Sequence, residues 1–292
     1  DKQYKVSALD CRINNELDDA AYVVLNGTSV TQHLKVEFNA GGGFNGWESD
    51  DITIADADST LEFDMPAKDV TLTALHGSSK LTFTDGIPDG IGSKSDKWTY
   101  RDGKLTFYAG YEADLGETEV NCPVDNEGTI VSGVFTQSVT NKNEAKISGG
   151  TFVNTVTNKG TIEGGVFAKV PSVDTYYVLN AANCVINNAI KNKAYVVAKN
   201  ANKLPQITVE SNAGQKFKNW ESAEMEIPTE NLTVNPLVFT APQTVANNEL
   251  NLTAVKVKTD IVVGPNGKPV DGSEEYPGSK FDGWEYANNT LT

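Results

Sequence analysis

Apolar and polar residues alternate in short runs along most of the chain. One example is Leu34–Phe38, in which Leu, Val and Phe alternate with Lys and Glu. Such alternation places the apolar side chains on one face of a strand, whereas an amphipathic helix repeats them every three or four residues. No long segment of the sequence has the helical spacing. The pattern therefore predicts a chain that is nearly all β.

The composition supports this prediction. The 292 residues include 28 Thr, which favours strands, and 28 Asn and 25 Gly, which favour the turns between strands. At roughly 150 residues per domain, the length allows about two domains with substantial cores. No run of about 18 apolar residues is present, so we expect no segment inserted into a membrane.

A long internal duplication is the strongest signal in the sequence. Residues 4–49 align without gaps with residues 177–222, at an offset of 173. The offset grows to 180 for the partner of Leu72–Ala74 and to 186 for the partner of Trp98–Thr106. Loops inserted between matched strands would produce such a growing offset, so we expect the two copies to share one fold.

A second, shorter repeat lies between the two copies. The pattern Ile-x-x-Gly-x-Phe occurs at residues 130–135, 147–152 and 162–167. Such a unit is typical of a rung of a parallel β-solenoid, with Ile and Phe stacked inside and Asn amides in ladders. We expect about three rungs over residues 122–170. The flanking segments would cap them, because a bare rung exposes a strand edge.

These repeats predict an all-β chain in which two β-rich repeat domains flank a short parallel β-solenoid. The expected parts are a first repeat domain (1–77), an aromatic connecting hairpin (78–121), the solenoid (122–170), a second repeat domain (171–256) and the start of a second hairpin (257–292). Because the second hairpin is truncated relative to the first, we expect a fragment, or a parent protein that continues into another solenoid. The alternatives are a natural end at Thr292 and a third repeat domain beginning at Phe281.

The charge excludes some classes of partner. A net charge of −15 argues against nucleic acid, whose phosphates need a basic surface, and against an anionic membrane surface. The excess is local, because residues 1–77 carry five basic and fourteen acidic side chains whereas residues 171–256 carry seven of each. Since the two copies differ, the charge is not a property of the repeated fold.

The sequence offers little catalytic chemistry. The two histidines, His33 and His76, lie outside any nucleophile motif, and we expect both at the surface. A solenoid hydrolase or lyase would need paired carboxylates, whereas Glu144 and Glu163 are isolated within the expected rungs. We therefore predict no catalytic residue.

Metal and redox sites are likewise not expected. The cysteines, Cys11, Cys122 and Cys184, are odd in number and lack metal-site spacing, which indicates small buried apolar side chains. Two acidic stretches lack the spacing of a calcium loop, so we predict solvated loops, no metal and no cofactor, with a structural calcium ion as the less favoured alternative. The acids concerned are Asp50, Asp51, Asp56, Asp58, Asp85, Asp89 and Asp96.

The connecting hairpin carries the candidate ligand-binding residues. Trp98 and Tyr100 alternate on one face of an expected strand, and Tyr108 follows the next strand. Exposed aromatic rings stack on sugars, so these three residues are weak candidates for a glycan site. We favour the alternative that the rings cover the open end of the solenoid.

Three motifs of the first copy resemble the divergent internalin-type B-repeat of bacterial surface proteins. They are Phe-Asn-Gly-Trp at residues 44–47, Phe-Asp-Met-Pro at residues 63–66 and Asp-Val-Thr-Leu-Thr-Ala at residues 69–74. The second copy keeps the order of these motifs but has Asn219 in place of Gly and Ala241 in place of Met.

The resemblance implies an extracellular, multi-module protein, bacterial cell-surface or secreted, of the kind found in gut bacteria, and it supplies no catalytic residue. We therefore predict a non-enzymatic spacer or adhesin segment, monomeric within a longer chain, whose partner would be a host or microbial surface glycan or protein. The alternative is a carbohydrate-binding module of a larger glycan-acting protein. A β-helix polysaccharide hydrolase or lyase is less favoured.

Overall fold

The structure is a computed structural model, and it shows an all-β chain. It describes residues 2–25, 32–54, 58–199, 201, 203–211 and 217–256, and five short strands beyond residue 256. The chain divides into two compact units. Unit 1 comprises residues 1–112 and 121–129, and unit 2 comprises residues 113–120 and 130–292.

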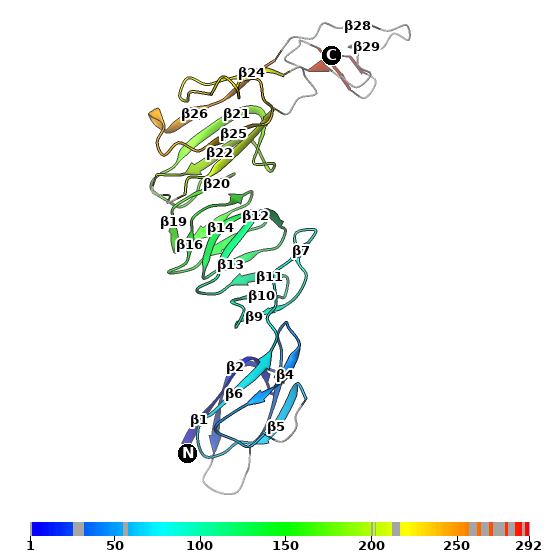
Figure 1. Ribbon diagram of the computed structural model, residues 1–292, viewed down its shortest axis with the longest axis vertical. Coiled ribbons are helices and arrows are strands. Elements are labelled where there is room, and N and C mark those ends of the chain that lie inside the picture. Colours follow the sequence, from blue (N-terminus) through cyan, green and yellow to red (C-terminus); the bar gives the residue numbers. More distant parts are fainter. Residues whose placement is uncertain are drawn as a thin grey trace. The chain divides into compact units, whose positions relative to one another are not determined.

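The first duplicated segment, residues 2–77 of unit 1, forms a six-stranded sheet (Figure 1). The strand order is β4-β6-β1-β3-β5, with β2 paired to β1. Strands β1 and β6 run parallel, and the other pairs are antiparallel. The strands are β1 (Lys2–Ile13), β2 (Leu17–Leu25), β3 (His33–Phe38), β4 (Phe44–Glu48), β5 (Thr60–Asp64) and β6 (Val70–His76).

The alternating apolar residues of these strands fill one core. In β3, Leu34 and Val36 are buried while His33 is exposed, as the alternation of this run predicts. Turns of the sheet use residues that tolerate the left-handed backbone region, such as Asn14 and Asn15 with φ of 50° and 62°. The pattern of apolar positions and the Asn-rich turns are thus sufficient to explain this sheet.

A buried cluster of polar groups joins this sheet to the hairpin that follows it in unit 1. The carboxylate of Asp10 accepts hydrogen bonds from the backbone N–H groups of Lys94 and Ser95 and from the Ser95 hydroxyl. The His76 side chain is only 8% exposed, and its Nε2 lies 3.7 Å from Asp10 Oδ2. The surface position expected for His76 is therefore wrong, because the ring packs between Asp10 and Phe38.

The hairpin region of unit 1 continues into the first coil of the solenoid. Its strand order is β13-β11-β10-β9, with β11 and β13 parallel and β9 to β11 antiparallel. A separate pair is formed by β7 and β8. The strands are β7 (Phe83–Thr84), β8 (Ile87–Pro88), β9 (Gly92–Ser93), β10 (Trp98–Arg101), β11 (Lys104–Phe107) and β13 (Val124–Asn126).

Unit 2 begins with the solenoid rungs. Parallel pairing of β14, β17 and β20 aligns Phe135, Phe152 and Phe167, whose rings stack at 5.1 and 4.8 Å between centroids. The strands are β12 (Glu112–Val120), β14 (Thr129–Phe135), β15 (Val139–Asn141), β16 (Lys146–Ile147), β17 (Thr151–Phe152), β18 (Val156–Asn158), β19 (Thr161–Ile162) and β20 (Gly165–Phe167).

The internal stack and the amide ladder predicted for the solenoid are confirmed. The amide of Asn141 donates a hydrogen bond to Oδ1 of Asn158 one rung further on, at 2.8 Å. The solenoid has about four turns instead of the predicted three. The additional turn escaped the sequence pattern because Leu105 in β11 pairs in parallel with Val124 although its segment lacks the Ile-x-x-Gly-x-Phe motif.

The second duplicated segment, residues 177–256 of unit 2, repeats the strand registers of the first. Val6 faces Val70 in the parallel pair of the first segment, and Leu179 faces Leu250 in the second. Val6 and Leu179 are 173 residues apart, and Val70 and Leu250 are 180 apart, which are the offsets of the sequence alignment. The strands are β21 (Tyr177–Ile186), β22 (Ile190–Val197), β23 (Gln206–Ser211), β24 (Phe217–Glu221), β25 (Leu237–Thr240), β26 (Glu249–Asn251) and β27 (Thr253–Lys256), with a short 3-10 helix at Ala246–Asn248.

The last solenoid rung and the second duplicated segment share one sheet. Strand β22 pairs antiparallel with β20, and Val196 lies opposite Val166. Both valines belong to a single hydrophobic core together with Tyr177 and Trp220. Strand β22 therefore covers the edge that the last rung would otherwise expose, and we call this contact the β20–β22 seam.

Beyond residue 256 the structure describes short strands by their backbone pairing. They are β28 (Val262–Val263), β29 (Pro269–Val270), β30 (Gly278–Ser279), β31 (Trp284–Ala287) and β32 (Thr290–Leu291). Ser279 pairs with Trp284 as Ser93 pairs with Trp98, and each residue of the second pair follows its counterpart in the first hairpin by 186 positions. The remainder of the second hairpin expected at 257–292 lies outside the described residues.

The stacking of rungs predicts a strong effect of Gly149→Ala. A Cβ at Gly149 would lie 2.3 Å from the carbonyl oxygen of Val131 on the adjacent rung, so the backbones must separate. We expect a loss of about 1–3 kcal/mol, typical of overpacking, measured by urea unfolding of the full chain. Gly90→Ala is the control, because nothing lies within 4 Å of its added Cβ. Equal effects of the two substitutions would contradict the close rung spacing.

Candidate functional site

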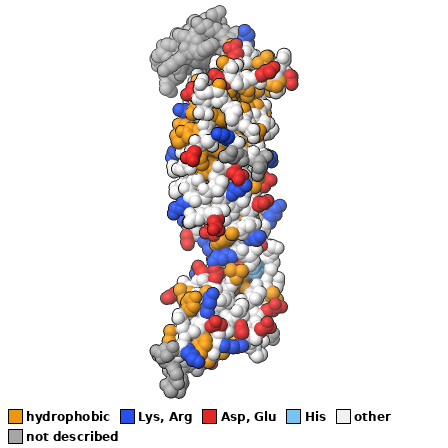
Figure 2. All heavy atoms as spheres, turned by 90° about the vertical axis from the view of Figure 1, so that its left-hand side faces the viewer, with side chains coloured by type: hydrophobic (Ala, Val, Ile, Leu, Met, Phe, Trp, Pro, Cys, Tyr) orange, Lys and Arg blue, Asp and Glu red, His pale blue; other side chains and the backbone are white. Residues whose placement is uncertain are grey.

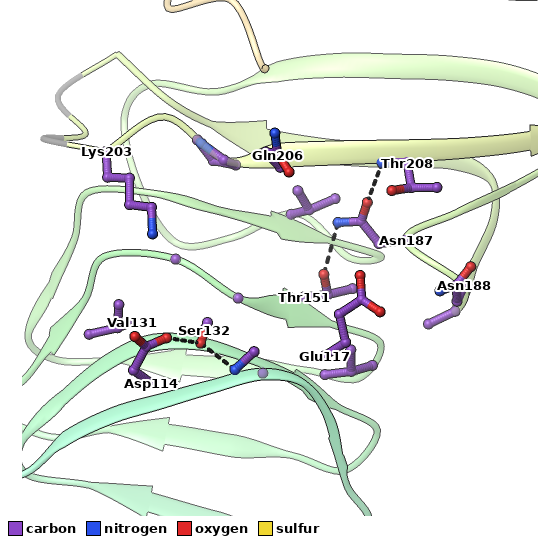
Figure 3. A pocket seen from close by; sticks show the side chains of 18 of the residues that line it. Asp114, Glu117, Val131, Ser132, Thr151, Asn187, Asn188, Lys203, Gln206 and Thr208 are labelled. Atoms are coloured by element: carbon purple, nitrogen blue, oxygen red, sulfur yellow. Dashed lines mark hydrogen bonds between the residues drawn. The ribbon is translucent and has the colours of Figure 1, made fainter. Parts of the chain in front are cut away.

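A groove of about 920 Å³ lies on unit 2 (Figure 3). One wall is strand β12, the floor is formed by the Ser-Gly and Gly-Gly turns of the solenoid rungs, and the other wall comes from the second duplicated segment. Three parts of the chain that are distant in sequence therefore build it. Its position beside the β20–β22 seam makes it the candidate binding site of unit 2.

The floor of the groove exposes backbone because two successive rungs place glycines there, namely Gly133, Gly149 and Gly150. Gly133 and Gly150 have φ of 127° and 102°, a region that side chains rarely adopt. Both occupy the fourth position of the Ile-x-x-Gly-x-Phe pattern. The glycines that fix the rung geometry thus also leave the groove open and line it with peptide groups.

The first wall carries carboxylates. Asp114, Glu117 and Glu119 all lie on β12 and line the groove. Asp114 accepts a hydrogen bond from the hydroxyl of Ser132, which in turn accepts the backbone N–H of Gly116 at 2.7 Å. This chain of hydrogen bonds fixes Asp114 against β14, while Glu117 remains exposed.

The second wall is organised by Asn187 at the turn between β21 and β22. Its amide donates to Thr151 Oγ1 at 2.9 Å, and its Oδ1 accepts the backbone N–H of Thr208 at 2.8 Å. Asn187 therefore ties a solenoid rung to β23 of the second duplicated segment. Lys203 supplies a cationic group from the same wall (Figure 3).

The described lining residues of the groove offer hydrogen-bonding groups, and their carboxylates are not arranged as in a glycoside hydrolase. Such an enzyme places two carboxylates on opposite sides of the bond to be cleaved. Here the three lining carboxylates stand on one strand, and the charged residue lining the other wall is Lys203. Carboxylates, amides and peptide groups together suit hydrogen bonding to a polar, uncharged ligand.

The three aromatic residues proposed from the sequence do not form one exposed platform. Trp98 is 2% exposed and donates its indole N–H to the carbonyl of Ser79 at 3.1 Å. Tyr100 shares the strand face of Trp98, whereas the Tyr108 hydroxyl lies 3.1 Å from Thr99 Oγ1, on the opposite face. Both tyrosines are half-buried. Binding at these residues stays a prediction.

Comparison with known proteins identifies one part of the chain. Residues 14–78 match the family model of the divergent InlB B-repeat domain. This family is typical of surface proteins. The resemblance predicted from the motifs of the first duplicated segment is confirmed for these residues. Comparisons with curated proteins and with solved structures gave no match.

Within the residues that match this family model, Asp51 has a structural contact that explains its position. Its Oδ2 accepts the backbone N–H of Thr71 at 2.9 Å, and its own N–H donates to Ser49 Oγ. In the second duplicated segment Glu224 does the same with the N–H of Asn251, at 3.1 Å. These backbone hydrogen bonds lower the pKa of both carboxyls. We call this contact the carboxylate clamp.

Two of the other acids considered as calcium ligands, Asp89 and Asp96, also have local hydrogen-bond partners. Asp96 accepts hydrogen bonds from Ser79 N–H and Ser93 Oγ, and the hydroxyls of Thr84 and Thr82 lower the pKa of Asp89. Asp56 lies outside the described residues. Among the residues that the structure describes, no three His, Cys, Asp or Glu side chains gather as metal ligands.

The histidine and cysteine side chains have packing or surface roles. His33 is exposed, and hydrogen bonds to Asp64 and then Glu62 raise its pKa. The three cysteines are buried, as interpreted from the sequence. Burial, with a contribution from Asp10, raises the pKa of Cys11 to about 12, and burial raises that of Cys122 to about 11. Such thiols are poor nucleophiles.

No helix in the described ranges has the length and apolar character needed to cross a membrane.

The carboxylate clamp predicts an acid-dependent effect of Asp51→Asn. Because the folded protein lowers the pKa of Asp51, its stabilisation is present above the ordinary value of 3.8 and is lost as the pH falls through the lower folded value. We expect the variant to melt at a lower temperature than the wild type at about pH 7, and the difference to disappear well below the ordinary carboxyl pKa.

Asp50→Asn is the matched control for this measurement. It removes a neighbouring charge for which the described part of the chain shows no hydrogen bond or ion pair. Thermal unfolding followed by circular dichroism over the pH range checks both variants. If Asp50→Asn and Asp51→Asn shift the melting temperature equally, the clamp contributes nothing specific.

Proposed function

We propose that this chain is a non-enzymatic structural module of an extracellular bacterial surface protein. In this proposal both duplicated segments are B-repeat domains, and the solenoid is a spacer element between them. The match at residues 14–78 supports the surface assignment, since this family is typical of surface proteins. The equal strand registers of β1–β6 and β21–β27 support the assignment of the second segment.

The observation that carries the proposal is the β20–β22 seam. A spacer must transmit position and force from one module to the next, which a flexible linker cannot do. Here the backbone hydrogen bonds of one sheet and a core shared by Val166 and Val196 connect the solenoid to the second duplicated segment. A shared core makes the two neighbours support each other's folding.

The charge of the surface fits this role better than nucleic-acid binding. On the face shown in Figure 2, acidic and basic side chains are interspersed. Over the whole chain, 39 acidic residues outnumber 24 basic ones. Mixed surfaces of this kind keep a protein soluble and give phosphate groups no basic stripe to follow.

Cooperative unfolding tests the structural proposal. We expect the solenoid rungs and the second duplicated segment to open with the same free energy, because the seam joins them. Hydrogen exchange of the full chain in increasing urea, resolved by peptide, measures both. Val196→Asp would place an unpaired charge in the shared core, lower this stability by several kcal/mol and separate the two transitions.

Val238→Asp is the control for this experiment, because Val238 is 46% exposed on β25. It should leave the exchange pattern unchanged. Independent opening of the rungs and the second segment in the unmodified chain would contradict the proposal, because a spacer then has no rigid connection at this point.

The groove on unit 2 favours carbohydrate binding as a second candidate function. Its glycine floor, the carboxylates of β12 and Lys203 offer hydrogen-bond partners for sugar hydroxyls. Aromatic rings, on which sugars commonly stack, are missing from its described lining residues. Carbohydrate binding therefore ranks below the structural role.

A glycan array probed with the full chain tests this second candidate. If a glycan binds in the groove, Glu117→Gln should weaken binding by about 10-fold or more, the cost of a lost charged hydrogen bond. Glu144→Gln, an exposed carboxylate that does not line the groove, should have no effect. Equal responses of the two variants would exclude the groove as the binding site. Release of reducing ends from bound glycans would contradict a non-enzymatic role.

A further inference from the structure

The outer edge of β2 in the first duplicated segment has no strand beside it. Among the described residues, β2 pairs with β1 on one side only. In its last half, two apolar side chains are exposed, since Tyr22 is 66% and Val24 is 49% exposed. Exposed apolar edge strands invite pairing, and natural proteins usually shield them with prolines, charges or a covering element. The stretch Ala21–Leu25 contains none of these residue types.

The equivalent strand of the second duplicated segment, β22, shows which strand can pair with such an edge. The sequence Ala-Tyr-Val-Val occurs at residues 21–24 in β2 and at 194–197 in β22, so Val24 corresponds to Val197. Val197 is 3% exposed, in contrast to the 49% of Val24. The difference coincides with β20, which pairs with β22 and places Gly165 opposite Val197.

The pairing also explains the residue types of the covering strand. Val166 lies opposite Val196 and enters the core of the second duplicated segment. Phe167 lies opposite Tyr195 and stacks on Phe152 inside the solenoid. A strand of glycine, an aliphatic residue and phenylalanine therefore satisfies the sheet edge on one side and the solenoid interior on the other.

We propose that β2 is a docking edge for the last rung of a β-solenoid. The occupant is a strand of the pattern Gly-aliphatic-Phe, running antiparallel to β2 with its glycine opposite Val24 and its phenylalanine opposite Tyr22. A second copy of this chain does not supply it, because both of its strands of that pattern, β14 and β20, are already paired within the chain. The inference rests on strand geometry and goes beyond the proposed spacer role. It does not depend on that role, because the β2 edge would be the same if the chain bound a glycan.

A chimera of the full chain tests the proposal. Residues 78–173, which include the hairpin and the solenoid, are placed directly before Asp1. Nine residues then separate the added Phe167 from Tyr4, as nine separate Phe167 from Tyr177 in the chain itself. The measurement is amide hydrogen exchange of residues 21–25. We expect exchange at least roughly tenfold slower in the chimera than in the unmodified chain, as for newly formed strand hydrogen bonds.

The matched control is the same chimera with V166D in the added rung only. It retains length and composition but places a charge where the aliphatic residue enters the core of the first segment, so the protection of residues 21–25 should be lost. Equal exchange at residues 21–25 in the chimera and the unmodified chain would overturn the proposal. A concentration-dependent dimer of the unmodified chain that Val24→Lys abolishes would also overturn it, because a second copy would then be the occupant.

A pair of substitutions in the unmodified chain keeps the proposal testable if the chimera does not fold. Val24→Lys should leave the melting temperature unchanged, because the β2 edge is open. Val197→Lys should lower it, because the same position is covered by β20. A destabilising effect of Val24→Lys would show that the β2 edge is already covered, and the proposal would fail.

Discussion

Backbone hydrogen bonding at strand edges is the constraint on which this structure depends. A β-solenoid of a few rungs has little core of its own, and its last strand presents unpaired N–H and C=O groups. In unit 2 these groups are satisfied by β22, a strand that belongs to a different kind of sheet. The requirement explains why Val166 and Val196 belong to one core and why the rung and the duplicated segment follow each other in sequence. It also makes β2, which has the same sequence as β22 over four residues, the informative exception.

Much of the fold could be predicted from the sequence because the determining signals are local or repeated. The offsets of 173 and 180 gave strand partners that the structure reproduces, such as Val6 with Val70 and Leu179 with Leu250. The rung motif also predicted the inward phenylalanine stack. Its Ile, Gly and Phe recur at the same positions of each unit, so parallel pairing of successive units brings their phenylalanines together. The additional turn of the solenoid was missed, since β11 coils with the rungs without carrying the motif.

The features that escaped prediction depend on contacts between distant residues. His76 is buried by Asp10, and Asp10 is held by Ser95, which is 85 positions away in the chain. The groove arises where β12, the rungs and the turn at Asn187 meet, and no single segment carries a signature of it. The carboxylate clamp is visible in the alignment of the two copies as a shared Ser-x-acid pattern, which begins at Ser49 and at Ser222. The pattern alone does not identify the backbone N–H groups of Thr71 and Asn251 as the hydrogen-bond partners, because these residues lie on distant strands.

The growing offset between the two copies has a practical consequence. Phe63 in β5 corresponds to Phe239 in β25, three residues further along than the 173-residue offset, and by Leu250 the difference has reached seven. The additional residues lie between β24 and β25 and between β25 and β26, where the chain includes the short 3-10 helix. Pairing of the flanking strands is the same in both copies. These two connections therefore accommodate additional residues while the flanking strands keep their pairing, and a foreign peptide grafted there for display has to leave Glu224 and the carbonyl partner of Trp220 in place.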